Sequence, residues 1–521
     1  MSKDNITLGQ PGGKLILDDF GSELGQVISD ALALRDRFPE IELKIFHDQE
    51  AHGENKKQER VQFQEWKKAQ TPLFESWEPP ETAEKAPPVR LERTGCPRMS
   101  PGMVYVFSML RGYLNSMNGR DAVDRIRDSR AVETYLAQIG QQRPAFRTIL
   151  DNINTVSQQT LNYILDCQLK VALEENLDDF DEQTLDSTSV EANSEWPTDA
   201  AVIYKLLERA CRLSGKLHVV SLPCFTDKWV LNHWLPEMKR LLLKVNTVSG
   251  KPGSKRKRKK YYNQLLKRAM KSLERLVPYA ATLKGDLNTL DLPPTARRRA
   301  EQTVDRIVQD LHSVCRMYQQ CHARVFKGRK TRARDKVLSL SDETAAFIKK
   351  GDREPVIGYK VQLARSTEGF VCAISVPKGN TADSDECVPL VEQSIQRTEV
   401  TPSGVTADDG YTSAPGRRAL ERLGVENIRF CGSKGKAITP QHEWESEEHR
   451  AARNNRSAVE SLMYVLKHGF AFGRVRRRGI ERVRCEMLEK AIAYNFCRLG
   501  LVRARKRAEE DAKRWKIPRA A

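Results

Sequence analysis

The chain has 521 residues, enough for about three domains of ordinary size, and 87 Lys and Arg against 69 Asp and Glu give it a formal net charge of +18. This excess of cations favours a polyanionic partner. No apolar run approaches the roughly 20 residues that cross a bilayer, and the N-terminus lacks the apolar segment of a secretory signal, so we expect a cytoplasmic protein without membrane association. The eleven cysteines include no Cys-x-x-Cys pair, which argues against a disulfide framework or a zinc site.

The N-terminal part of the chain divides into two regions. Residues 1–100 contain two Pro-Pro pairs and a mixed-charge run, and they predict a poorly defined, irregular region. Residues 101–176 show helical periodicity, and a segment that begins near Ser157 places Leu and Ile side chains on one face. We interpret residues 101–176 as a small helical domain that binds DNA.

A long helical stretch separates the predicted strands. One strand is predicted at residues 183–190, but the next ones, at residues 356–364 and 369–376, come much later. Residues 199–345 therefore predict a helical insertion. Its long helix near Thr295 repeats apolar residues at helical spacing, a stripe that forms either a core or a dimer seam, and core is the commoner use.

Two strongly basic segments lie in this insertion, at residues 251–260 and 324–336. Both predict basic loops. They are either solvated loops or contacts to phosphate groups, because such contacts need clustered cations and tolerate disorder. The cations expected to contact DNA in the first segment are Lys255, Arg256, Lys257, Arg258, Lys259 and Lys260.

The C-terminal half alternates strands and helices. Together with the strand at residues 183–190, this order suits an α/β fold with a ribonuclease H-like core, in which carboxylates from two neighbouring strands and one helix converge. We assign residues 177–198 and 346–505 to this core and residues 506–521 to a basic C-terminal tail. The later elements are expected at residues 384–395 (helix), 404–407 (strand), 414–423 (helix) and 426–430 (strand).

Three segments each offer a carboxylate in a different setting. Asp186 lies in the strand at residues 183–190, Asp408 ends an apolar strand where α/β sites gather, and Glu460 lies on a helix. Magnesium prefers oxygen ligands, and two such cations roughly 4 Å apart assist in-line displacement at a phosphodiester. The three acids together therefore suit metal-dependent phosphodiester chemistry, whereas any one alone carries little weight among the 69 acids of the chain.

The helix around Glu460 has a regular pattern of charges. Offsets of four, three and four place Arg456, Glu460, Met463 and Lys467 on one helical face. The arrangement is either a stabilising surface stripe or an acid ligand between two phosphate clamps. Spacing alone favours the surface stripe.

Several segments occur in a specific order, and the combination is far more distinctive than any one piece. They are Leu185-Asp-Ser-Thr-Ser-Val-Glu-Ala-Asn193, Trp196-Pro-Thr-Asp199, Pro377-Lys-Gly-Asn-Thr-Ala-Asp383, Thr406-Ala-Asp-Asp-Gly-Tyr411, Arg456-x3-Glu460-x6-Lys467 and Ala493-Tyr-Asn495. In this order, across residues 105–505, they resemble the DDE transposases of bacterial insertion sequences that carry the Arg-x3-Glu-x6-Lys signature.

The resemblance implies a ribonuclease H-like fold, Mg²⁺ or Mn²⁺ as cofactor, cleavage at the ends of a mobile element and strand transfer into target DNA. It matches Asp186, Asp408 and Glu460 to the catalytic metal ligands. It matches Arg456 and Lys467 to basic residues near the DNA end. The implied partners are terminal inverted repeats and target DNA, and we expect a homodimer or higher oligomer on DNA, associated with the nucleoid.

The chain departs from the family pattern in two places. Where the family has a tyrosine before the signature, this chain has Arg453, and the helical insertion falls between the first and second acids rather than between the second and third. Hairpin chemistry therefore does not follow from the resemblance. In the Ala-Asp-x-Gly-Tyr pattern the ligand is the residue after alanine, so we choose Asp408 and expect Asp409 to turn outward or cap the next turn.

Two other interpretations compete with an active transposase. One is a catalytically inactive DNA-binding protein derived from such an enzyme, against which the retention of all three acids and Lys467 argues. The other is a structural RNA-binding protein, which the basic segments allow, although no aromatic-rich motif of an RNA-recognition module occurs. Metal-dependent nicking of a DNA end separates the active transposase from both of these interpretations.

Overall fold

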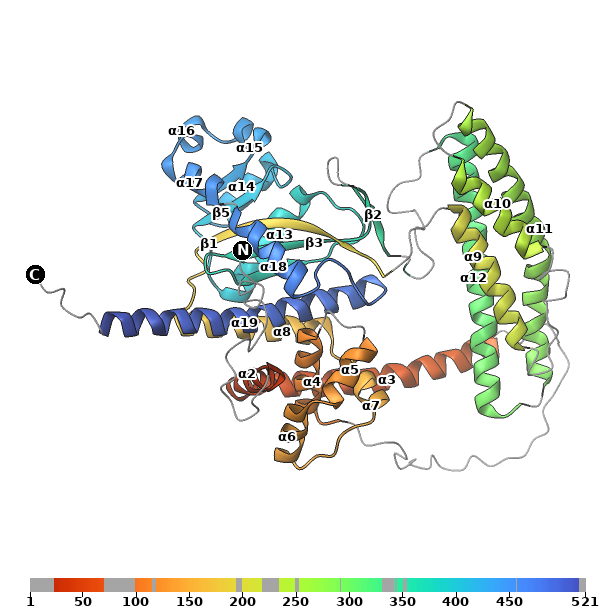
Figure 1. The fold of residues 1–521 in the computed structure, drawn as a ribbon, viewed down its shortest axis with the longest axis horizontal. Helices are drawn as coiled ribbons and strands as arrows, with labels where there is room; N and C mark the ends of the chain where they lie inside the picture. Colours follow the sequence, from red (N-terminus) through yellow and green to blue (C-terminus); the bar gives the residue numbers. More distant parts are fainter. Residues whose placement is uncertain are drawn as a thin grey trace, which may run out of the picture. The chain divides into compact units, whose positions relative to one another are not determined.

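The computed structural model describes residues 23–69, 99–114, 119–193, 199–217, 234–248, 253–290, 292–329, 342, 344–349, 354–455 and 457–514. The chain forms two compact units, which are described separately (Figure 1). The first unit comprises Met1–Val190, Val361–Val376 and Thr381–Ala521, and the second comprises Glu191–Lys360 and Pro377–Asn380. Within the described residues, no helix is long and apolar enough to cross a membrane.

A mixed sheet is built from β1 (Glu182–Glu191), β2 (Ala346–Ile348), β3 (Val356–Ser366), β4 (Val371–Ser375), β5 (Gly404–Asp408) and β6 (Asn427–Cys431). The strand order is β2-β3-β1-β5-β6, and β4 also pairs with β3. β1 is parallel to β5 and β5 to β6, whereas β2 and β4 are antiparallel to β3. The sheet and its flanking helices confirm the α/β class and the predicted strands. β2 was not predicted, because a strand of this length is too short to show an alternation of apolar and polar residues.

The helices of the first unit come before, between and after these strands. They are α2 (Glu23–Arg37), α3 (Glu40–Ala69), α4 (Pro101–Tyr113), α5 (Gly119–Arg127), α6 (Arg130–Gln138), α7 (Phe146–Ile153), α8 (Gln158–Glu174), α13 (Asp383–Thr398), α14 (Ala414–Arg422), α15 (Ser433–Ile438), α16 (Gln441–Trp444), α17 (Glu447–Asn455), α18 (Ser457–Gly469) and α19 (Ile480–Arg514). The last of them shows that residues 506–514, predicted as a tail, continue a helix.

Helix α19 ties the N-terminal helices of the first unit to the sheet. It packs on α4, α8 and β4, and α13 packs on β4 and α8 (Figure 1). Helix α8 begins as predicted, because the Ser157 hydroxyl accepts a hydrogen bond from Thr160 N at 3.1 Å and caps the first turn. Its residues Leu161 and Ile164 are fully buried. Residues 101–176 thus share a core with the sheet.

The prediction of irregular structure at residues 1–100 is wrong for residues 23–69, which form α2 and α3. Helix α2 buries Leu24, Val27, Ile28 and Ala31 and packs on α4 and α6. This spacing of three, one and three residues is helical, but the segment is too polar on its other face to be conspicuous. Tertiary packing, rather than local propensity, therefore defines this helix.

The second unit contains a helical bundle of α9 (Asp199–Leu217), α10 (Leu235–Thr247), α11 (Ser254–Thr289) and α12 (Pro294–Lys327) (Figure 1). Helix α9 packs on the other three, and α11 also packs on α10 and α12. The stripe predicted on α12 lies in the bundle core, where Val304, Ile307, Leu311 and Val314 are buried. The stripe is therefore core, as the commoner use of such stripes suggested.

Candidate functional site

Two neighbouring strands bring Asp186 and Asp408 together. β1 and β5 are parallel, and their last registered pair is Leu185 and Ala407, so the next residue on each strand is one of these acids. Both side chains are half-buried. Asp408 Oδ1 accepts a hydrogen bond from Gly410 N at 2.9 Å, and Asp186 Oδ1 accepts one from Ser187 N at 2.7 Å. A backbone N–H one or two residues further along the chain thus orients each carboxylate.

A buried polar chain lies beside these two acids. The Tyr411 hydroxyl donates to Gln362 Oε1, and Gln362 Nε2 donates to Asp383 Oδ1 at 2.6 Å. Gln362 belongs to β3, and Asp383 begins α13. Because Gln362 and Tyr411 are fully buried, the two hydrogen bonds fix the orientation of the Gln362 amide.

Three carboxylates influence the electrostatics of the Tyr411 hydroxyl. Burial raises the pKa of Tyr411 well above its usual value, and the negative charges of Asp383, Asp186 and Asp408 raise it further. All three acids are close enough to act on this group, although they are far apart in sequence. The Tyr411 hydroxyl therefore stays protonated at neutral pH and keeps its donation to Gln362.

Gly410 allows two of these carboxylates to approach each other. A Cβ atom at this position would lie 3.0 Å from both Asp383 Oδ2 and Asp408 Oδ1. A side chain here would push the ends of both carboxylate side chains away by a few tenths of an ångström. Asp383 was not predicted as a site residue. The detectable signal was its place at the end of the segment Pro377–Asp383, one of the motifs that carry the resemblance.

Asp409, adjacent to Asp408 in the chain, has a different set of contacts. Its carboxylate accepts hydrogen bonds from Lys434 N at 2.9 Å, Gly435 N at 3.0 Å and Ser433 Oγ at 3.2 Å, and thereby caps the start of α15. Burial works against the charged form, but these hydrogen bonds prevail and lower the pKa of Asp409. Gly432 leaves room for this contact, because a Cβ there would overlap the Asp409 carboxyl.

Glu460 lies in the first turn of α18, and its side chain is exposed. Lys467, in the last turn, is also exposed, whereas Met463 is buried, so the predicted face of the helix is divided. Arg456 lies outside the described residues. Over the described ranges, no group of three or more His, Cys, Asp or Glu side chains is arranged to hold a metal ion. The structure thus groups Asp186 with Asp408 but does not add Glu460 to them.

Arg453 has a structural contact where the family pattern has tyrosine. Its guanidinium carbon lies 4.3 Å from the centre of the Trp444 ring, and His449 packs on the same ring with a centroid distance of 4.8 Å. A cation over an indole face is stabilising by about 0.5–1 kcal/mol at exposed sites. Arg453 therefore helps to join α16 to α17.

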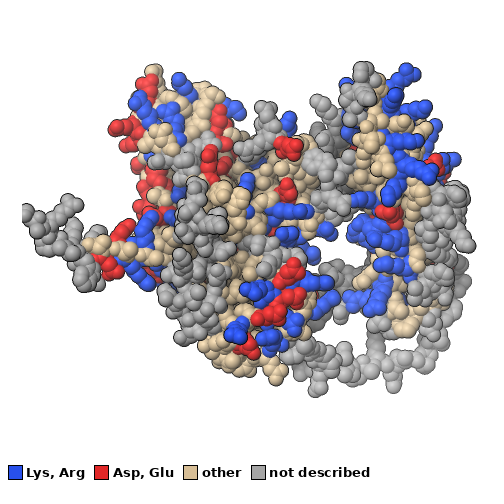
Figure 2. Space-filling view, in the orientation of Figure 1, with Lys and Arg blue, Asp and Glu red and all other residues tan. Residues whose placement is uncertain are grey.

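Residues 251–260 were predicted as a basic loop, and this prediction is wrong for the basic run, residues 255–260. Helix α11 begins at Ser254, so the run forms its first two turns, with every side chain exposed. Lys and Arg are good helix formers, and Tyr262 and Leu265, buried just beyond the run, anchor the helix in the bundle. On the face shown in Figure 2, Lys and Arg side chains gather over this bundle.

A groove of about 630 Å³ opens beside the basic run in the second unit. Arg324, near the end of α12, lines it and forms an ion pair of 2.6 Å with Asp199. Of the second basic segment, residues 330–336 lie outside the described residues. Cations at a helix N-terminus oppose the helix dipole, so six of them near the start of α11 are locally unfavourable and favour an anionic partner. Besides Arg324, the cations that line the groove are Lys255, Arg258 and Lys259.

Residues 325–496 match the family model of the transposase DDE domain. A search of curated proteins and a search of solved structures found no match. The matched segment includes Asp383, Asp408 and Glu460, and it begins after Asp186. The match supports the resemblance to DDE transposases that the motifs indicated, and it identifies a transposase-type DDE domain in the C-terminal part of the chain.

Proposed function

We propose that the protein is a DNA transposase that cleaves DNA at the ends of a mobile element and transfers the strands into target DNA. The observation that supports it best is the pairing of two parallel strands, β1 and β5, that places Asp186 beside Asp408. The match of residues 325–496 to the transposase DDE domain gives this pair its chemical context. We further propose that the core is ribonuclease H-like, because two neighbouring strands carry the first two acids, as expected for that fold.

Asp186, Asp408 and Glu460 are the residues that would hold divalent cations, Mg²⁺ or Mn²⁺. Two observations fit such ions: the donors are all carboxylate oxygens, and the carboxylates of Asp186 and Asp408 act together on the Tyr411 hydroxyl. Bound cations would supply activation of the attacking oxygen and stabilisation of the leaving oxygen. The hydrogen-bonded chain from Tyr411 through Gln362 to Asp383 fixes the buried polar groups next to this site.

DNA is the proposed partner, and its contacts fall in two places. Lys467 and Arg456 would contact the cleaved end near Glu460. The basic run on α11 would supply affinity for any duplex, which its exposure and its position at a helix N-terminus support. We also propose that the protein acts as a homodimer or higher oligomer on DNA, in the cytoplasm at the nucleoid.

The proposal is tested by cleavage of a labelled duplex that carries the element end, in Mg²⁺. Asp186→Asn, Asp408→Asn and Glu460→Gln should each reduce cleavage by about 10³-fold or more, because the loss of a metal ligand removes several kcal/mol of transition-state stabilisation. Duplex binding should persist in all three. Asp385→Asn is the matched control, because Asp385 is an exposed acid in the first turn of α13.

The outcomes separate the proposal from its alternative, a catalytically inactive DNA-binding protein derived from a transposase. Wild-type protein that binds the end but does not cut it in Mg²⁺ or Mn²⁺ would support the alternative. Substantial cleavage by any one of the three variants would remove that acid from the site. A loss in Asp385→Asn as large as in the others would show that the effect is not specific to the proposed ligands.

A further inference from the structure

The connection between α18 and α19 is rich in arginine. Residues 473–479, here called the arginine loop, read Gly-Arg-Val-Arg-Arg-Arg-Gly and contain no acid. Arg474, Arg476 and Arg478 are exposed, whereas Val475, between the first two, is fully buried. The loop therefore presents three guanidinium groups at alternate positions.

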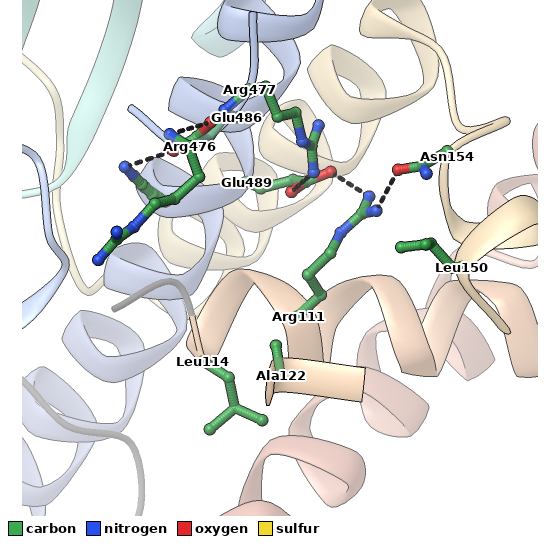
Figure 3. Close-up of a pocket in the computed structure, with 10 residues that line it drawn as sticks. Arg111, Leu114, Ala122, Leu150, Asn154, Arg476, Arg477, Glu486 and Glu489 are labelled. Atoms are coloured by element: carbon green, nitrogen blue, oxygen red, sulfur yellow. Dashed lines mark hydrogen bonds and ion pairs between the residues drawn. The ribbon is translucent and has the colours of Figure 1, made fainter. Parts of the chain in front are cut away.

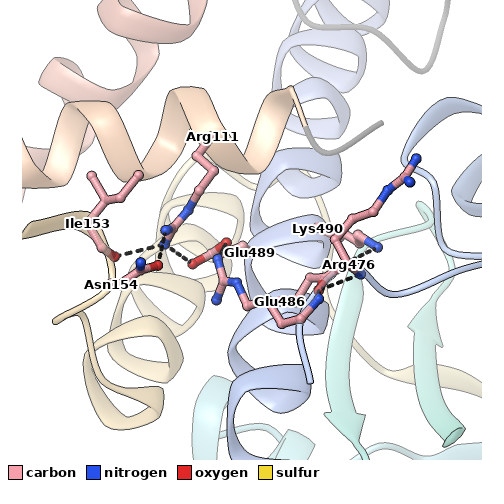
Figure 4. A network of polar contacts seen from close by, with 8 residues as sticks. Arg111, Ile153, Asn154, Arg476, Glu486, Glu489 and Lys490 are labelled. Carbon is pink, nitrogen blue, oxygen red and sulfur yellow. Dashed lines mark hydrogen bonds and ion pairs between the residues drawn. The ribbon is translucent and has the colours of Figure 1, made fainter. Parts of the chain in front are cut away.

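Two buried charged side chains of α19 hold the backbone of this loop (Figure 4). Glu486 accepts hydrogen bonds from Arg476 N at 2.9 Å and Arg477 N at 2.8 Å. Lys490 donates from Nζ to the carbonyl oxygens of Ala471 at 2.9 Å and Arg474 at 3.2 Å. Glu486 and Lys490 also pair with each other at 2.8 Å. Because both are buried and their charges are used on backbone groups, the conformation of the loop is fixed.

The fourth arginine faces inward and anchors the loop to the N-terminal helices of the same unit. Arg477 bonds Glu489, which also accepts from Arg111 at 2.6 Å (Figure 3). Arg111 in turn donates to Asn154 Oδ1 at 2.7 Å and to the Ile153 carbonyl at 2.8 Å. Arg111, Asn154, Arg477 and Glu489 line a cavity of about 200 Å³. Breaking a buried pair of this kind is costly, so the anchor is rigid.

We propose that the arginine loop is a preorganised surface that binds the backbone phosphates of duplex DNA through Arg474, Arg476 and Arg478. Guanidinium groups suit phosphate oxygens, and a loop fixed in advance loses little conformational entropy on binding. An ordinary solvated run of arginines needs no buried ion pair to hold its backbone, and burial of such a pair carries a desolvation cost. The inference rests on the proposed function only in taking DNA as the ligand.

The test is a salt titration of duplex binding in the presence of a chelator, so that cleavage plays no part. Replacing Arg474, Arg476 and Arg478 by alanine together should lower affinity by at least about tenfold and flatten the slope of log affinity against log salt by about 2 to 3, since each phosphate contact contributes about 0.9. The same triple change to lysine should restore most of the slope. The matched control replaces three exposed arginines elsewhere in the unit, Arg418, Arg422 and Arg450.

The outcomes decide the proposal independently of catalysis. A smaller slope in the alanine variant, with the control unchanged and the lysine variant restored, supports the loop as a phosphate surface. An unchanged slope, or an equal reduction in the control, overturns it. If wild-type protein binds with the full slope yet cleaves no element end, the proposed function fails while the loop retains its role. Circular dichroism of the triple variants checks that folding is intact.

Discussion

The first unit, here called the sheet unit, and the helical bundle of the second unit arrange their charged side chains in opposite ways. In the sheet unit, Asp186, Asp383 and Asp408 come from three distant segments and act on one buried hydroxyl, that of Tyr411. In the bundle, six cations follow one another in the basic run on α11, and all are exposed. The acids depend on their relative positions, so replacing a single one should have a large effect on cleavage. The exposed cations should contribute to DNA affinity mainly through their number.

The basic run offers the largest expected change in binding and the most direct way to break this comparison. Replacing all six cations of residues 255–260 by glutamine should flatten the slope of log affinity against log salt by up to about 5, at about 0.9 per phosphate neutralised. The change should be equal on specific and random duplexes. The measurement is a salt titration of binding with wild-type protein and the variant.

A matched variant tests whether the position of the six cations matters or only their number. Lys239, Arg240, Lys267, Lys271, Arg298 and Arg299 are six exposed cations scattered over the same bundle. If their replacement flattens the slope as much as replacement of the basic run does, the bundle acts by net charge alone. An unchanged slope in the variant of residues 255–260 would show that the run is only a solvated helix end.

The two regions also differ in how far they could be predicted from the sequence. Alternation and strand ends identified β1, β3, β4, β5 and β6, because the hydrophobic pattern is local. The adjacency of Asp186 and Asp408 depends on the pairing of β1 with β5, which no local pattern contains. The motif resemblance supplied that information.

Other features of the site could not be predicted, for identifiable physical reasons. Asp383, at the start of α13, accepts a hydrogen bond from Gln362 on β3, a contact across distant segments. The basic run was mistaken for a loop because its helix is anchored by buried residues further along, Tyr262 and Leu265. Helix α2 was missed because its stability comes from α4 and α6 rather than from its own sequence.

A substitution at Asp383 tests the same comparison and should have a smaller effect on cleavage. Asp383→Asn keeps a carbonyl oxygen to accept from Gln362 but removes one of the three negative charges around Tyr411. We expect the Mg²⁺ concentration for half-maximal cleavage to rise about tenfold, with the maximal rate largely kept. This tenfold change corresponds to a loss of about 1.4 kcal/mol of electrostatic attraction for the cation. The measurement is a Mg²⁺ titration of cleavage, with Asp385→Asn as control. An unchanged Mg²⁺ dependence would show that Asp383 only supports the fold.

The smallest expected effect on activity is at Asp409, one residue from a proposed metal ligand. Asp409→Asn should retain most cleavage per folded molecule, because its carboxylate faces α15 rather than Tyr411. It should lower the free energy of unfolding by about 1 kcal/mol, the usual loss for a weakened helix cap. Cleavage in Mg²⁺ and urea unfolding at pH 7 measure the two effects. Loss of cleavage in a folded Asp409→Asn protein would move the metal-ligand assignment by one residue.

The stability difference between wild type and Asp409→Asn should itself depend on pH. Folding lowers the pKa of Asp409, through its hydrogen bonds to the start of α15 and despite its burial. The charged cap therefore stabilises fully above the unfolded pKa of about 3.9, and this contribution is lost as the pH falls through the lower folded value. Asparagine does not titrate, so the difference in unfolding free energy should be constant between pH 5 and pH 7, both about a unit or more above 3.9, and shrink as the pH falls below 3.9. Urea unfolding of both proteins across this range provides the test, and a difference that stays constant into acid would show that the Asp409 charge does not stabilise the cap.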